Sequence, residues 1–140
     1  MKLLTLFLLT SVFSSAANIT DDSNDLFVVV TSSDAETQMM SMVLATQSAN
    51  QDVDIRILLC SEGGKLAIEG EQFPAFQPAD RSPQQLLRGL IDHGATVEVC
   101  AIFLPNRDYN EADLIEGVGI ANPRDVAEYM KGDGVRYFTF

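Results

Sequence analysis

The chain has 140 residues, the length of one domain, and 46% of them are hydrophobic, which excludes a disordered acidic chain. Its formal net charge of −11 repels nucleic-acid phosphates and anionic lipid headgroups, so we expect no nucleic-acid partner and no basic membrane attachment. Its two cysteines are too few for a disulfide-dense scaffold or a four-cysteine zinc site, and a compact acidic domain remains.

The N-terminus is typical of an export signal. Lys2 precedes an apolar run from Leu3 to Phe13, and small residues follow from Ser14 to Ala17. A membrane-spanning helix needs about 20 apolar residues, so this shorter run favours a cleaved signal peptide. We predict a signal peptide over residues 1–17, a disordered polar segment over residues 18–25, and a mature periplasmic protein that does not span the membrane. A buried or amphipathic N-terminal helix is the alternative.

Residues 26–140 begin with the continuous apolar run Leu26–Val30, which is typical of a strand buried on both faces. Ser33–Glu36 has the pattern of a capping box, and the helix that it starts is expected to continue to about Asn50. The alternating run Val53–Cys60 predicts a second strand. A long connection is expected over Ser61–Arg81, with one helical turn over Lys65–Glu69. The buried stripe of the first helix is predicted to hold Ala35, Met39, Met42, Val43 and Thr46.

The second half of the chain repeats this alternation. Ser82, Pro83 and Gln85 form a helix start, and Gly94 favours the end of that helix. The remaining predicted elements are a strand over Thr96–Phe103, a short helix over Glu111–Ile115, a helix capped by Asn122, and a strand over Arg136–Phe140. The alternation predicts an α/β domain with a mostly parallel sheet and helices on both faces.

Ligands of such sheets lie beyond the carboxyl ends of the strands, where both cysteines are predicted to fall. A reactive thiolate needs a nearby cation, and Arg107 could serve Cys100 in this way. The alternatives are a buried thiol that packs as a small hydrophobe and a Cys60–Cys100 disulfide, since exported proteins often pair their cysteines. Neighbouring strands would place the two Cα atoms about 5 Å apart, whereas an intervening strand would separate them by about 10 Å. The sequence leaves the strand order open.

Several segments resemble the DsrE/DsrF-like family, and most closely its exported members. They are Val53–Cys60 with Gly64–Ala67, Ser82–Leu87, Gly94–Cys100 followed by Leu104–Asn106, Gly117–Gly119 and Pro123. The resemblance covers most of residues 26–140. It implies a three-layer α/β/α sandwich with a mostly parallel sheet of about four to five strands, and assembly into homo-oligomers such as trimers or hexamers. It also implies sulfur handling, with persulfide sulfur carried on the cysteine after the third strand, here Cys100.

Our leading hypothesis is a periplasmic sulfur carrier in which Cys100 forms the persulfide and Cys60 is a resolving or neighbouring thiol. Its partner would be a sulfur donor or acceptor, either a small molecule or a protein, and any activity would be sulfurtransferase-like. We expect no cofactor. The residues predicted to line the pocket are Ser32, Ser61, Glu62, Asn106 and Arg107. The alternative is a non-enzymatic binding or assembly domain whose Cys60–Cys100 disulfide is structural.

Other polar and sulfur-containing residues favour structural roles, so we expect no metal site. His93 falls at a predicted helix end, where a cation is favourable. Met39 and Met42 fit the core stripe better than a copper site. The acidic residues Asp108, Glu111, Asp113 and Glu116 lack the spacing of a calcium loop and are typical of a solvated surface.

Overall fold

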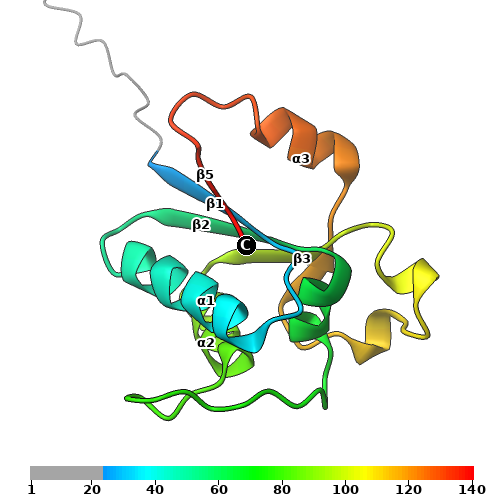
Figure 1. Cartoon of the computed structure of the whole chain (residues 1–140). Coiled ribbons are helices and arrows are strands. Elements are labelled where there is room, and N and C mark those ends of the chain that lie inside the picture. Colours follow the sequence, from blue (N-terminus) through cyan, green and yellow to red (C-terminus); the bar gives the residue numbers. More distant parts are fainter. Residues whose placement is uncertain (1–23) are drawn as a thin grey trace, which may run out of the picture.

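The structure is a computed structural model that describes residues 24–140 (Figure 1). The predicted signal peptide lies outside the described residues, as does the predicted polar segment up to residue 23. Asp25, which we expected in that segment, is the first residue of a strand. The helices and strands are β1 (Asp25–Val30), α1 (Ala35–Ala49), β2 (Asp54–Leu59), the 3₁₀ helix η1 (Ser61–Ala67), α2 (Pro83–Asp92), β3 (Thr96–Val99), the 3₁₀ turns Leu104–Asn106 and Glu111–Asp113, β4 (Val118–Ile120), α3 (Pro123–Tyr129) and β5 (Arg136–Thr139).

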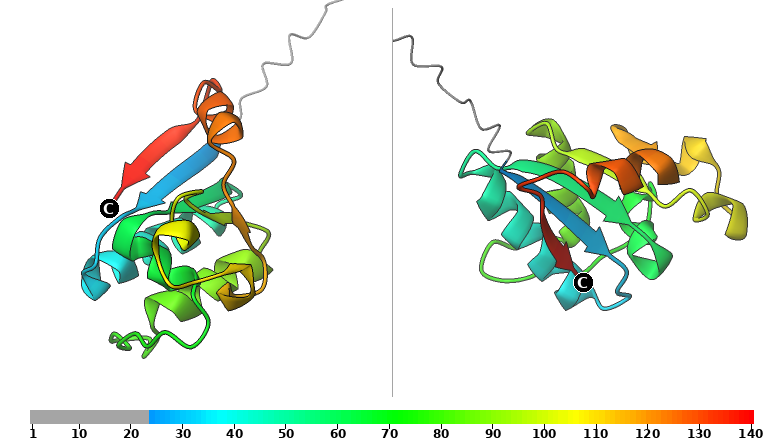
Figure 2. Two further views of the ribbon diagram at one scale, coloured as in Figure 1. Left: turned by 90° about the vertical axis from the view of Figure 1, so that its right-hand side faces the viewer. Right: turned by 90° about the horizontal axis from the view of Figure 1, so that it is seen from above.

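The five strands form one sheet in the order β4-β3-β2-β1-β5, and every neighbouring pair is parallel. Helices α1 and α2 pack together on one face, and α3 lies on the opposite face (Figure 2). The predicted α/β/α architecture is therefore confirmed.

The two faces of the sheet follow from strand alternation. Leu26, Val28 and Val30 of β1 belong to the main core beneath α1 and α2. Phe27 points to the other face, where it packs with Val126 and forms an edge-to-face pair with Tyr129, both from α3.

Each of the three α-helices begins at a side chain that accepts a backbone N–H. Asp34 caps α1 by accepting from Thr37 at 2.7 Å, so the cap is the carboxylate rather than the predicted Ser33. Ser82 and Gln85 form the predicted capping box of α2. Asn122 caps α3, as predicted.

The buried stripe of α1 differs from the predicted one. Met42 is buried as expected, but Gln38 and Ser41 are buried beside it, at 2% and 0% exposure. Gln38 donates from Nε2 to the carbonyl of Ser32 at 2.7 Å, and the Ser41 hydroxyl donates to the carbonyl of Gln38 at 2.7 Å. These local hydrogen bonds let polar residues face the sheet.

Two strands differ from the prediction. The third strand ends at Val99 rather than Phe103, because the chain turns after Cys100 and brings Phe103 into the core. The strand β4, over Val118–Ile120, was not predicted. It contains Gly119 and has only three residues, so its extended form depends on pairing with β3 rather than on local propensity.

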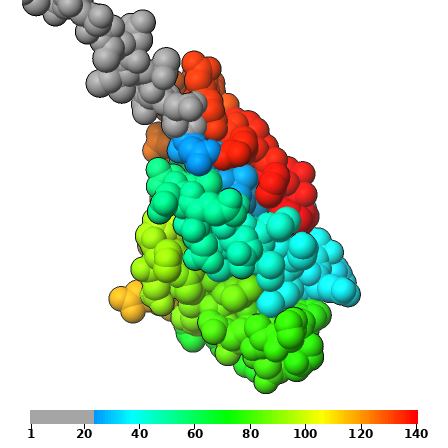
Figure 3. All heavy atoms as spheres, turned by 90° about the vertical axis from the view of Figure 1, so that its left-hand side faces the viewer, coloured from blue at the N-terminus to red at the C-terminus, as the bar shows by residue number. Residues whose placement is uncertain are grey.

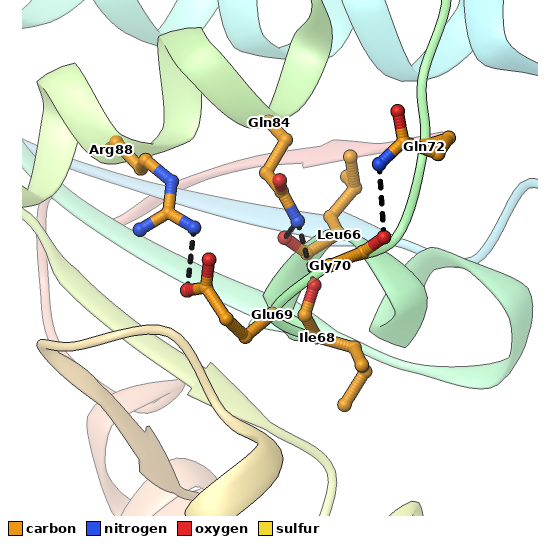
Figure 4. Close-up of polar contacts among 7 residues, drawn as sticks. All are labelled: Leu66, Ile68, Glu69, Gly70, Gln72, Gln84 and Arg88. Atoms are coloured by element: carbon orange, nitrogen blue, oxygen red, sulfur yellow. Dashed lines mark hydrogen bonds and ion pairs between the residues drawn. The ribbon is translucent and has the colours of Figure 1, made fainter.

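The connection after β2 forms η1 instead of a turn over Lys65–Glu69. Two buried glycines let it pack closely, since a Cβ at Gly63 would overlap the carbonyl of Val30 and one at Gly64 would overlap the ring of Phe103. Behind it, α2 holds the end of η1 (Figure 4). Gln84 donates from Nε2 to the carbonyls of Leu66 and Ile68, at 3.0 and 2.8 Å.

Replacing Gly63 by alanine should lower the free energy of unfolding by about 1–3 kcal/mol, because backbone must move to accept the methyl group. Gly89→Ala is the matched control, since Gly89 lies inside α2 and, among the described residues, no atom beyond its chain neighbours and its own helix backbone comes within 4 Å of the place that its Cβ would take. This second change should raise stability by about 0.5–1 kcal/mol through helix propensity. Urea unfolding of both variants measures the contrast, and equal effects would contradict the close packing of η1.

Candidate functional site

Cys60 and Cys100 form a disulfide with a Cα–Cα distance of 5.2 Å. Because β2 and β3 are neighbours in register, Leu59 opposite Val99, the residues that follow them come side by side. The sheet hydrogen bonds continue through both cysteines, since Cys60 N–H donates to Val30 and Cys100 N–H to Leu59, each at 2.9 Å. The strand order left open by the sequence is thus the one that allows pairing.

The disulfide lies at the carboxyl edge of the sheet, and both cysteines are half-buried. Neither is the fully buried thiol of the hydrophobic alternative. Cys60 leads directly into η1, and Cys100 leads into the turn that carries Phe103. The bond therefore joins the roots of two loops at the edge where parallel α/β sheets hold their ligands.

Charged and aromatic side chains join the same two loops independently of sulfur. The carboxylate of Glu62 accepts from Lys65 at 2.9 Å and from Arg107 at 2.7 Å. The guanidinium of Arg107 lies 5.1 Å from the centre of the Phe103 ring, which stacks on Tyr109 at 6.0 Å. Arg107, predicted as a cation for the Cys100 thiolate, has its charge paired with Glu62.

These contacts change proton affinities at the site. The hydrogen bonds from Lys65 and then Arg107 lower the pKa of Glu62 below its usual 4.5, and Glu62 in turn raises the pKa of Lys65. The phenol of Tyr109 donates to Glu71 at 2.8 Å, and this carboxylate raises the pKa of Tyr109. At neutral pH Glu62 is an anion that holds two cations.

The structure brings together most of the predicted pocket residues. Ser61 and Glu62 directly follow Cys60, and Asn106 holds the turn after Cys100 by donating to the carbonyl of Ile102 at 2.8 Å. Ser32 is placed differently, on the connection between β1 and α1, where its hydroxyl accepts from the N–H of Asp34 at 3.1 Å. Their roles toward a substrate stay predictions.

Sequence reasoning missed residues that hold η1 and the connection between β1 and α1 in place. No role was predicted for Gln84 or Arg88 of α2, yet Gln84 binds the end of η1 and Arg88 pairs with Glu69 at 2.7 Å (Figure 4). Gln38 orients the Ser32 carbonyl, and its own Oε1 has no hydrogen-bond partner among residues 24–140. The spacing of apolar residues along a helix does not predict such long-range contacts.

Within residues 24–140, no three His, Cys, Asp or Glu side chains are grouped so that they could hold a metal ion. His93 lies at the C-cap of α2, as predicted. No helix of this described part of the chain has the length and apolar character needed to cross a membrane.

The fold and the disulfide place this protein in a structural class. It is a parallel α/β/α domain with a half-buried disulfide at the carboxyl ends of two adjacent strands, β2 and β3. The model of the DsrE/DsrF-like family matches residues 24–140, and the chain belongs to this family.

Two curated proteins are similar to this chain in sequence. The chain is 27% identical over 115 residues to the uncharacterized protein MJ0760 of Methanocaldococcus jannaschii, covering 81% of this chain but only 42% of that protein. It therefore spans less than half the length of MJ0760. The uncharacterized protein MJ0989 of the same organism is 32% identical over 81 residues, covering 58% of this chain and 68% of that protein.

Two solved structures share the fold. The ychN protein from E. coli aligns with a TM-score of 0.65 and 20% identity, covering 84% of this chain and 99% of that chain. MTH1491, a protein of unknown function from Methanobacterium thermoautotrophicum, aligns with a TM-score of 0.61 and 16% identity, covering 83% and 97%.

Opening the disulfide should lower the free energy of unfolding by about 4 kcal/mol, because the bond closes a loop between residues separated by 40 positions in the unfolded chain. The fold should persist, since the β2–β3 ladder does not depend on sulfur. Urea unfolding with and without reductant measures the loss. The double variant Cys60→Ser, Cys100→Ser is the control, and reductant should leave its stability unchanged.

The Glu62 contacts should stabilise the protein above the unfolded-state pKa of this carboxyl, near 4.5, and be lost as the pH falls through its lowered folded-state pKa. Glu62→Gln should therefore lose stability at neutral pH and change less than the wild type between neutral pH and about pH 3. Urea midpoints at both pH values test this. Glu116→Gln, at an exposed site, should keep the wild-type pH dependence.

Proposed function

We propose that this protein is an exported, periplasmic sulfur carrier that holds persulfide sulfur on Cys100, with Cys60 as the resolving thiol. The observation that carries the proposal is the pairing of Cys60 with Cys100 at the ligand-binding edge of the sheet. Membership of the DsrE/DsrF-like family supports a role of the sulfur-relay type.

Loading follows from ordinary thiol chemistry. In the reduced protein, the Cys100 thiolate attacks the outer sulfur of a sulfane donor such as thiosulfate, forming a new sulfur–sulfur bond. The sulfur–sulfur bond of the donor breaks, and sulfite leaves with the bonding electron pair. The electrons balance without an external oxidant, and the protein holds Cys100 as a persulfide.

Unloading has two routes. An acceptor thiolate takes the outer sulfur and leaves the Cys100 thiolate behind. Alternatively, the Cys60 thiolate attacks the inner sulfur, expels hydrosulfide and forms the Cys60–Cys100 disulfide. The structure contains this bond. Hydrosulfide attack on Cys100 reverses the step, because it breaks the disulfide, leaves Cys60 as a thiolate and returns Cys100 to the persulfide.

The surrounding residues support this chemistry mainly by position. Glu62 and Arg107 fasten the loop after Cys60 to the loop after Cys100, and Asn106 fixes the turn between Cys100 and Arg107. In this proposal Ser61 and Ser32 contact the donor or acceptor. The partner is a sulfur donor or acceptor, and the carrier acts as part of a homo-oligomer.

The second candidate is a binding or assembly domain with a structural disulfide. It is favoured by the same bond and by the β2–β3 hydrogen bonds that hold the cysteines together. The two functions differ in reduction potential. A structural disulfide is expected below about −300 mV, whereas a carrier needs a higher, more readily reduced value.

The reduced Cys60→Ser variant, treated with thiosulfate or polysulfide, should gain about 32 Da on Cys100, because a persulfide forms and no thiol remains to resolve it. Cys100→Ser is the control, and Cys60 in that variant should gain little or no sulfur. Mass spectrometry of protein recovered from the periplasmic fraction also gives the N-terminus, expected after residue 16 or 17. Absence of an adduct on Cys100 together with a potential below about −300 mV would establish the structural alternative.

A further inference from the structure

The segments of chain that follow Cys60 and Cys100 meet beyond the disulfide. The N–H of Glu69, at the end of the first segment, donates to the carbonyl of Asp113, in the second, at 2.8 Å. Figure 3 shows the exposed continuation of the first segment, in green, at one end of the molecule, away from β5 in red. The two segments that begin at the cysteines therefore form one continuous surface.

A hollow of about 430 Å³ lies where the two segments meet. Its walls carry the carboxylates of Glu69, Glu71 and Asp113 and the phenol of Tyr109, and no lysine or arginine of residues 24–140 lines it. A hollow lined by charges of one sign concentrates the electric field and attracts the opposite charge. The side chain of a lysine or an arginine fits this hollow in both size and charge.

The protein itself balances this negative charge only in part. Arg88 of α2 pairs with Glu69 at 2.7 Å (Figure 4). Glu71 accepts from the uncharged phenol of Tyr109 at 2.8 Å, and Asp113 accepts a backbone N–H at 2.7 Å. Within the described part of the chain, Arg88 is thus the one cation that forms an ion pair with these three carboxylates, and hydrogen bonds from neutral groups do not cancel the other two charges.

The basic residues nearest to the cysteines are also occupied. Residues 60–71 and 100–114 contain two cations, Lys65 and Arg107, and both pair with Glu62, at 2.9 and 2.7 Å. The whole chain carries 20 acidic and 9 basic residues. A small sulfur anion therefore finds no unpaired cation in these two segments and approaches a surface of its own charge, whereas a positively charged partner is attracted.

Aromatic rings separate the hollow from the sulfur site. Phe103 lies in the turn after Cys100, and its ring stacks on Tyr109 with 6.0 Å between the ring centres. Tyr109 in turn lines the hollow. A ligand that reaches both the sulfur and the hollow must cross this pair of rings. A polypeptide can do so, because it can present a cysteine to Cys100 and a neighbouring basic side chain to the hollow.

We propose that the sulfur partner of Cys100 is a protein whose reacting cysteine is flanked by a lysine or an arginine, and that this basic side chain enters the hollow lined by Glu69, Glu71 and Asp113. The inference rests on the proposed sulfur-carrier function and identifies its partner by charge. In the hand-over, the partner's thiolate attacks the outer sulfur of the Cys100 persulfide and forms a new sulfur–sulfur bond. The bond to Cys100 breaks, and the Cys100 thiolate leaves with its electron pair.

Three capped peptides test the charge of the partner. Each holds one cysteine, flanked by two lysines, two glutamines or two glutamates, as a mixed disulfide with 2-thiopyridine. The Cys100 thiolate of the reduced Cys60→Ser variant attacks the peptide sulfur and releases pyridine-2-thione, whose absorbance gives the rate. Relative to 2-mercaptoethanol with the same peptides, the lysine peptide should react about tenfold or more faster than the glutamate peptide at low ionic strength. Salt at about 0.5 M should reduce this ratio.

Two variants test the hollow itself. Glu71→Gln removes one charge, while its amide oxygen can still accept from Tyr109, and should lower the lysine-to-glutamate ratio by about two- to fivefold. Asp113→Asn is a second variant of the same kind. Asp52→Asn is the matched control, because it removes the same charge at the amino edge of the sheet, just before β2, and it should leave the ratio unchanged.

Equal rates for the three peptides, or a faster glutamate peptide, would overturn the proposal. So would a ratio that Glu71→Gln and Asp113→Asn leave unchanged, or that Asp52→Asn lowers as much, since the net charge of the chain would then explain the preference. The proposed function fails separately, if Cys100 gains no persulfide sulfur from any donor. If Cys100 gains sulfur but shows no preference among the peptides, only the present inference fails.

Discussion

The pairing of β2 with β3 is the interaction on which the site depends. Their register sets Leu59 opposite Val99, and the hydrogen bond from Cys100 N–H to the Leu59 carbonyl extends the ladder by one step. This backbone contact, rather than the sulfur bond, brings the cysteines to a Cα distance of 5.2 Å. Reversible thiol chemistry needs such an arrangement, because reduced thiols must stay close enough to react again.

A second set of contacts acts beyond the ends of the strands. Glu62 and Arg107 tie the loop after β2 to the loop after β3, and Gly64 admits the ring of Phe103 between them. From behind, Gln84 of α2 holds the end of η1 through two backbone carbonyls. The loops around the half-buried cysteines are therefore held in place by these contacts. Many α/β proteins bind ligands at this edge of the sheet, on loops that are commonly more mobile than the strands.

Local patterns predicted the elements whose signals are local. The apolar run Leu26–Val30 became β1, and the Ser82 capping box became the start of α2. The predictions failed where packing overrides propensity. Gln38 and Ser41 are buried because each donates a hydrogen bond to a nearby backbone carbonyl, and β4 is extended because it pairs with β3. The shortened third strand reflects the same rule, since the turn after Cys100 buries the ring of Phe103 in the core.

The sequence by itself determined the α/β class, the two cysteines at strand ends and the candidate residues Glu62, Asn106 and Arg107 that follow them, because these are properties of contiguous residues. Only the tertiary structure decided that β2 and β3 are neighbours, that Arg107 pairs its charge with Glu62, and that β5 is the outermost of the described strands, next to β1. These contacts are between residues that are far apart in the sequence. No local pattern encodes them, since they arise from how strands with similar apolar faces are ordered in one sheet.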